Sequence, residues 1–161
     1  MAKTTPHNKG QQNMRYILIV LCLVFSGCTI QEYDDFQLVG WSAEEEQVIS
    51  DALNDWNTTI TISNHSKNKI QKVEKLPGKR IGEILFLTND YSSRWATISI
   101  LELDNTKLTK SIHHEIGHFL AWYNGFDNYK THLSPGNVMA EYEENIPDQI
   151  TEDDRIYAFG E

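Results

Sequence analysis

The sequence predicts one α+β domain, in which a small twisted sheet packs on an N-terminal helix and on a second helix that carries the candidate active site. Three observations lead to this prediction. An amphipathic pattern begins at Ser42, apolar and β-branched runs follow at residues 81–87 and 96–101, and a longer helical pattern covers residues 108–123. At 161 residues the chain is long enough for one such domain but not for two.

The first part of the chain has the features of an export signal. Three basic residues precede an apolar run, residues 16–25, which is too short to span a bilayer. The apolar run ends in the sequence Phe-Ser-Gly-Cys at residues 25–28, which resembles the lipobox of bacterial lipoproteins. We therefore expect residues 1–27 to be a signal peptide, with Met1 or Met14 as the true start. Residues 28–41 would then be a lipidated Cys28 followed by a tether.

Charge and cysteine content narrow the functions that the chain can have. The formal net charge is −9, and loss of residues 1–27 removes three basic residues and no acidic one, which leaves −12. Such an acidic chain is not expected to bind nucleic acid, and it would need the lipid on Cys28 to stay at an anionic membrane. Cys22 and Cys28 are the only cysteines, so a chain that begins at Cys28 cannot form an internal disulfide.

The first predicted helix begins with Ser42 as N-cap, and Glu45 completes a capping box. Its core face carries apolar residues at helical spacing: Val48, Ile49, Ala52, Leu53 and Trp56. The stretch 36–39, at the end of the tether, has the composition of a short first strand. After the helix, the β-branched residues 58–62 predict another strand.

Two further strands are expected before the second helix. Residues 67–79 are basic and end in a Pro-Gly turn signal, and the apolar run at 81–87 then predicts a buried strand. Residues 96–101 alternate between apolar and polar types, which is typical of a strand with one exposed face.

The second helix is predicted over residues 108–123, with Thr109 or Ser111 as its cap and Asn124-Gly125 as its end. The face away from the candidate site would carry four apolar residues: Ile112, Ile116, Phe119 and Leu120. Residues 134–137 predict a turn. A short C-terminal helix would begin at Thr151, where Asp154 completes another capping box.

The second helix contains the pattern His-Glu-x-x-His. Residues four apart lie on the same face of a helix, so His114 and His118 can offer two imidazoles to one metal ion. Glu115 stands next to this face, where a carboxylate can accept a proton from a water molecule that zinc has activated. The five residues alone also fit an ordinary surface helix, so their surroundings have to decide between the two.

The motif, the later Asn-Val-Met at residues 137–139 and the order of elements from about residue 40 resemble the metzincin zinc peptidases, and among them the matrixin-type catalytic domain. The resemblance implies that His114 and His118 bind zinc, that Glu115 is the general base, and that Met139 lies in the tight turn beneath the metal. It also implies that Asp154 ties the last helix to that turn.

The chain departs from the family pattern after the second histidine, where Ala121 and Asn124 replace the usual glycine and third ligand. We expect His132 to be the third zinc ligand, because it is the only histidine between the helix and Met139. The alternatives that remain open are Asn124, Asp127, Glu141 and Glu144. Tyr142 is a candidate to help stabilise the oxyanion, or else a packing residue, and we expect His113 to point outward or to support the site from behind.

Taken together, the sequence predicts a monomeric zinc endopeptidase, with residues 42–161 as its metallopeptidase domain, held by lipid in the bacterial cell envelope. Its peptide or protein substrate would lie along a free edge of the strand at residues 96–101. Three alternatives remain open. They are a peptidase with a glutamate as third ligand, a binding lipoprotein that has the fold without catalysis, and a structural envelope lipoprotein.

Overall fold

The computed structural model describes residues 35–89, 93–139 and 146–160. The predicted signal peptide and Cys28 lie outside the described residues, as do Glu141, Tyr142 and Glu144. The side chains of residues 88, 89 and 93 are also left out of the description. The described residues belong to one compact unit.

A mixed four-stranded sheet forms one layer of this α+β unit, in the order β1-β2-β4-β3. The strands are β1 (Phe36–Val39), β2 (Asn68–Val73), β3 (Gly82–Asn89) and β4 (Ser93–Leu101). β1, β2 and β4 are parallel to one another, whereas β3 is antiparallel to β4. β1 and β3 therefore form the two edges of the sheet.

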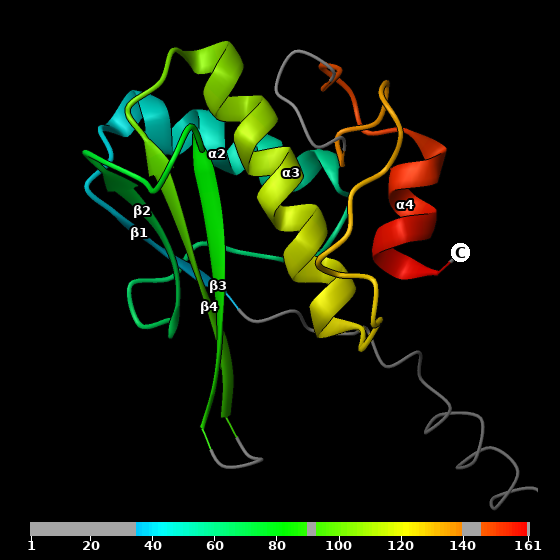
Figure 1. Ribbon diagram of the computed structural model, residues 1–161. Helices are drawn as coiled ribbons and strands as arrows, with labels where there is room; N and C mark the ends of the chain where they lie inside the picture. Colours follow the sequence, from blue (N-terminus) through cyan, green and yellow to red (C-terminus); the bar gives the residue numbers. More distant parts are fainter. Residues whose placement is uncertain (1–34, 90–92, 140–145, 161) are drawn as a thin grey trace, which may run out of the picture. The chain divides into compact units, whose positions relative to one another are not determined.

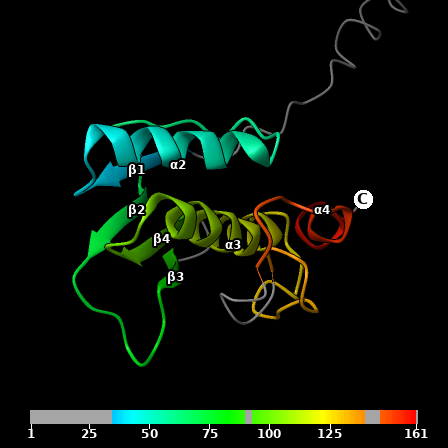
Figure 2. The same cartoon turned by 90° about the horizontal axis from the view of Figure 1, so that it is seen from above.

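The helices are α2 (Ala43–Asp55), α3 (Asn105–Tyr123) and α4 (Glu152–Phe159). α2 and α3 lie on the same face of the sheet, and α4 packs on the far side of α3 (Figures 1 and 2). Along β4, Ala96, Ile98 and Ile100 point into this core and are fully buried. α3 is thus the central element, with the sheet on one side and α4 on the other.

The N-terminal caps of two of the three described helices are the residues that the sequence predicted. Ser42 and Thr151 both make the predicted capping boxes, with Glu45 and Asp154 respectively. The prediction for α3 was wrong by three residues, since this helix begins at residue 105. Asp104 is its cap, accepting a hydrogen bond from the backbone N–H of Lys107 at 3.0 Å.

The predicted strand at residues 58–62 was wrong, because this stretch makes only a single bridge, from Ile62 to Phe36 of β1. The strand that enters the sheet here is β2, within the stretch that was expected to be only basic. Its Ile70 is fully buried while Lys69 is exposed, so β2 alternates between the two faces of the sheet. Lys69 on the open face, and Lys72, which forms an ion pair with Glu45 of α2, hid this pattern in the sequence.

The expectation that residues 81–87 form a buried strand also needs correction. β3 is an edge strand, and the side chain of Leu85 is 57% exposed. β4 lies between β2 and β3, so both of its edges are already hydrogen-bonded. It cannot receive a substrate strand as predicted. The free edge on this side of the sheet belongs to β3.

β1 confirms the short first strand predicted at residues 36–39, and it is part of the sheet, although residues 28–41 as a whole were expected to be a tether. Phe36 is fully buried, and its ring meets that of Phe119 on α3 edge to face, with ring centroids 4.8 Å apart. The compact unit therefore includes residues before the expected boundary at Ser42.

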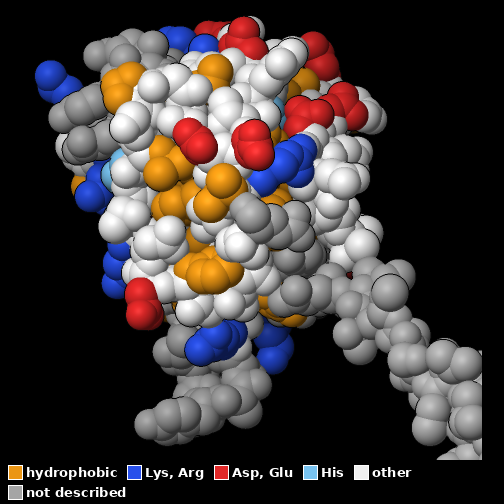
Figure 3. Space-filling model, turned by 90° about the vertical axis from the view of Figure 1, so that its right-hand side faces the viewer, with side chains coloured by type: hydrophobic (Ala, Val, Ile, Leu, Met, Phe, Trp, Pro, Cys, Tyr) orange, Lys and Arg blue, Asp and Glu red, His pale blue; other side chains and the backbone are white. Residues whose placement is uncertain are grey.

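Seen from the α4 side, acidic side chains gather toward one end of the unit, with exposed hydrophobic groups at the centre of this face (Figure 3). Within the described ranges, none of the helices has the length and apolar character needed to cross a membrane.

Candidate metal centre

His114 and His118 come from successive turns of α3 and face the same side of the helix. Their Nε2 atoms lie 3.1 Å apart, and their rings are nearly perpendicular, with centroids separated by 4.7 Å. The apolar residues predicted for the other side of the helix are all fully buried: Ile112, Ile116, Phe119 and Leu120. Burial of that face sets the rotation of the helix, so the two imidazoles turn toward the loop before α4.

His132 joins them from the loop after α3. Its ring centroid lies 5.2 Å from that of His114 and 5.2 Å from that of His118. One nitrogen from each of the three histidines lies within 4.8 Å of the others, so the group could hold a metal ion. Asn124 and Asp127 do not belong to this group. Asn124 ends α3, and its side-chain amide donates to the carbonyl of Ala158 at 2.8 Å.

The Nδ1 atoms of His114 and His118 each have a partner that fixes the tautomer of the ring. Nδ1 of His114 lies 2.8 Å from the carbonyl of Val138, which can only accept, so this nitrogen carries the proton. Nδ1 of His118 lies 3.0 Å from the hydroxyl of Tyr157. That hydroxyl shares its single proton between the carbonyls of Asn128 and Thr131, both at 3.0 Å, and therefore accepts from His118.

Tyr157 was not identified as a functional residue from the sequence. It lies on α4 and is only 4% exposed. Its hydroxyl connects His118 on one side with the backbone of the loop that leads to His132 on the other. In the sequence it is one apolar position of a short amphipathic helix, and no local pattern distinguishes it from a core tyrosine.

Burial keeps the two helix histidines neutral. The pKa of His114 is lowered to about 4, mainly by desolvation. The hydrogen bond to the Val138 carbonyl raises this pKa and the charge of His132 lowers it, both by smaller amounts. The pKa of His118 is lowered to about 3, mainly by desolvation and in smaller part by the charges of His114 and His132. Both rings are therefore unprotonated at Nε2 near pH 7, which is the form that binds a metal ion.

The two helix histidines have the spacing expected around a tetrahedral ion that prefers nitrogen, and the third donor, from His132, lies within 4.8 Å of them. Ligands at ~2.0–2.1 Å from a tetrahedral zinc are about 3.3 Å from one another, close to the 3.1 Å between the two Nε2 atoms. These two atoms have no proton to share in the tautomers derived above, so a cation between them would relieve the facing lone pairs. Imidazole ligands also suit copper, nickel and iron, so the donor set alone does not identify the metal.

Glu115 is buried beside the edge strand β3. Its side chain is so close to Gly82 that a Cβ placed there would lie 2.8 Å from Oε1. The pKa of Glu115 is raised to about 8, mainly by desolvation and in smaller part by Glu83, while Arg80 opposes the rise. A glycine at residue 82 thus leaves room for the carboxyl group between α3 and β3.

Met139 is fully buried beneath α3 and reaches the helix at Gly117. A Cβ on Gly117 would overlap the Met139 sulfur at 2.2 Å, so only glycine permits this approach. Asp154 holds the turn from the other side, accepting from the backbone N–H groups of Val138 and Met139, both at 3.1 Å. This confirms the expected tie between the last helix and the turn.

His113 does not point outward as one of the expectations had it. It is fully buried toward α2, and its Nε2 lies 2.9 Å from the carboxylate of Asp55. Desolvation lowers the pKa of His113, although Asp55 opposes this. The residue joins α3 to α2 on the side away from the three-histidine group.

Comparison with protein-family models, with curated proteins and with solved structures finds no match for this chain. The resemblance to metzincins thus rests on the motif residues and on the order of the elements in the sequence.

Proposed function

We propose that the protein is a zinc-dependent endopeptidase, held in the bacterial cell envelope as a lipoprotein and built on a metzincin-like plan. The observation that carries the proposal is the convergence of His114, His118 and His132 from a helix and a distant loop. Three imidazoles leave a fourth position of a tetrahedral ion open, which is the arrangement of catalytic rather than structural zinc sites.

Glu115 is the residue that we assign to proton transfer. When bound, the metal would supply Lewis acidity for the scissile carbonyl and a water molecule, and its charge would favour the ionised form of Glu115. The Glu115 carboxylate would accept the proton of the attacking water and pass it to the leaving amine. Its burial beneath β3 excludes bulk water from this transfer.

The substrate would pair with the free edge of β3. An extended peptide can add to an exposed strand edge through main-chain hydrogen bonds. Gly82, on this edge strand, touches Glu115, so a peptide paired with β3 would pass beside the general base. The substrate edge is thus one strand further out than the sequence suggested.

The test is hydrolysis of a peptide library by the full chain loaded with zinc, compared with Glu115→Gln. General-base catalysis contributes about 10²–10⁴-fold, and the variant should lose activity by that factor while it keeps its zinc. Glu46→Gln, at an exposed position of α2, is the control with the same chemical change. Full activity of Glu115→Gln would refute the mechanism. Zinc binding without hydrolysis by the wild-type chain would instead indicate a binding protein.

A further inference from the structure

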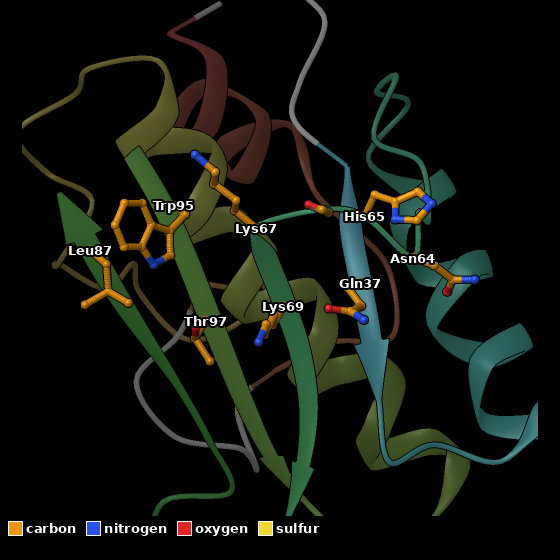
Figure 4. A pocket seen from close by; sticks show the side chains of 9 residues that line it. Gln37, Asn64, His65, Lys67, Lys69, Leu87, Trp95 and Thr97 are labelled. Carbon is orange, nitrogen blue, oxygen red and sulfur yellow. The ribbon is translucent and has the colours of Figure 1, made fainter. Parts of the chain in front are cut away.

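A second site lies on the face of the sheet that the helices leave open. A hollow of about 730 Å³ opens there, and it is lined by strand residues such as Lys69 and Thr97 that alternate with those facing α2 and α3. All four strands contribute to it, together with the loop before β2 (Figure 4). None of the three histidines of the candidate metal centre lines this hollow, so it is separate from the proposed catalytic site.

The side chains that line the hollow are sorted by type across the sheet. Lys67 and Lys69 stand on the β2 side, whereas Leu87 and the indole of Trp95 stand on the β3 side (Figure 4). Thr97 lies between them, because it pairs with Lys69 on β2 and with Leu85 on β3. A ligand here would meet positive charge on one flank and an apolar surface on the other.

The lysines are available to a ligand. Both are exposed, and no ion pair among the described residues includes either of them. No aspartate or glutamate lines the hollow, although the chain as a whole has 23 acidic and 14 basic residues. Local positive charge on an acidic protein favours a small anionic group that touches this hollow alone.

We propose that the hollow binds an extended acidic segment of a partner polypeptide in which an apolar residue stands between two acidic ones. Lys69 lies on β2 and Lys67 lies in the bend directly before this strand, so two cationic side chains stand on the same flank of the hollow. Alternate side chains of an extended peptide point to the same side, so two of them can face this flank. With its backbone above Thr97, such a peptide directs carboxylates toward the lysines and the intervening side chain toward Trp95 and Leu87.

The net charge of the whole chain disfavours larger polyanions as ligands of the hollow. A nucleic acid or an anionic membrane would bring many negative charges close to a protein with a net charge of −9. A short peptide segment contacts the two lysines without that repulsion. This site requires neither zinc nor catalysis, so it stands or falls independently of the proposed peptidase activity.

The experiment measures binding of two labelled peptides to the metal-free full chain by fluorescence anisotropy. One peptide is Gly-Glu-Phe-Glu-Phe-Glu-Gly, and the other has the same composition in the order Gly-Glu-Glu-Glu-Phe-Phe-Gly. The alternating peptide should bind more tightly, and added salt should weaken it. Lys67→Glu/Lys69→Glu should reduce affinity at least about tenfold, since rim charges become repulsive.

The matched control is Lys75→Glu/Lys79→Glu, which makes the same charge change at exposed positions outside the hollow. Its affinity for the alternating peptide should stay close to that of the wild type. Equal loss in both double variants, equal binding of the two peptides, or no binding to the wild type would each overturn the proposal. Preference for vesicles of anionic lipid over the peptide would do so as well.

Discussion

His114 and His118 are held in a different way from His132, although the three form one group. The two helix residues are buried or half-buried on the central element of the fold, and their Nδ1 atoms bond to Val138 and Tyr157. His132 is exposed on a loop, and its ring stacks on that of His114 at an interplanar angle of 15°. The helix sets the first two positions through its period, whereas distant contacts set the third.

The contacts that position the loop come from α4. Tyr157 donates to the carbonyl of Thr131, the residue before His132, and Asp154 holds the turn that carries Val138 and Met139. Leu133, next to His132, donates its backbone N–H to the carbonyl of Met139 at 2.8 Å. The short C-terminal helix thus supports both sides of the site, and the comparison predicts that ligands of the two kinds respond differently to substitution.

Replacement of the histidines themselves should have the largest effect. His118→Ala and His132→Ala should each lower zinc affinity by more than the ~100-fold typical of losing an outer partner of a ligand. Only His118→Ala should also destabilise the metal-free protein, by about 1–3 kcal/mol, because it leaves the buried Tyr157 hydroxyl without its donor. Chelator competition and urea unfolding measure the two quantities. Wild-type zinc affinity in His132→Ala would remove the loop residue from the site.

Removal of the Tyr157 hydroxyl should have a smaller effect on both kinds of ligand at once. Tyr157→Phe keeps the ring but loses the bonds to His118 and to the loop, so we expect a decrease of about 10–100-fold in zinc affinity. Tyr129→Phe is the control, since that ring packs on Phe86 with centroids 4.9 Å apart and keeps this contact without its hydroxyl. Chelator competition with zinc measures both variants. Equal affinities for the two would show that the Tyr157 hydroxyl does not position the ligands.

Substitution of Gly117 tests whether the helix ligands also depend on the turn. An alanine at an ordinary helix position stabilises by roughly 0.5–1 kcal/mol relative to glycine. At Gly117 the new methyl group would overlap Met139, and such overpacking costs about 1–3 kcal/mol. Gly117→Ala should therefore lower the free energy of unfolding in urea, and the additional change Met139→Ala should relieve part of the loss. If Gly117→Ala were more stable than the wild type, the turn that carries Met139 would be able to move away from the helix at little energetic cost.

Local patterns predicted much of the fold, because they depend on residues close in sequence. The capping boxes at Ser42 and Thr151, the end of α3 at Asn124-Gly125 and the buried face of that helix all follow from neighbouring residues. β2 escaped prediction, since Ile70 shares its face of the strand with the polar residues Asn68 and Lys72, while Lys69 stands on the open face. The pairing of β4 with two neighbours was also hidden, because strand order depends on contacts between distant segments.

The same division holds at the candidate site. The spacing of His114, Glu115 and His118 is a property of the helix period, and it can be read without knowledge of any other element. The convergence of His132 and the role of Tyr157 depend on how a loop and α4 pack against α3, which no local pattern encodes. The hollow beside Trp95 likewise exists only because four strands come together in one order, which brings Lys69, Thr97 and Leu85 into a single row. Periodicity acts between neighbours along the chain, whereas these sites arise from contacts across it.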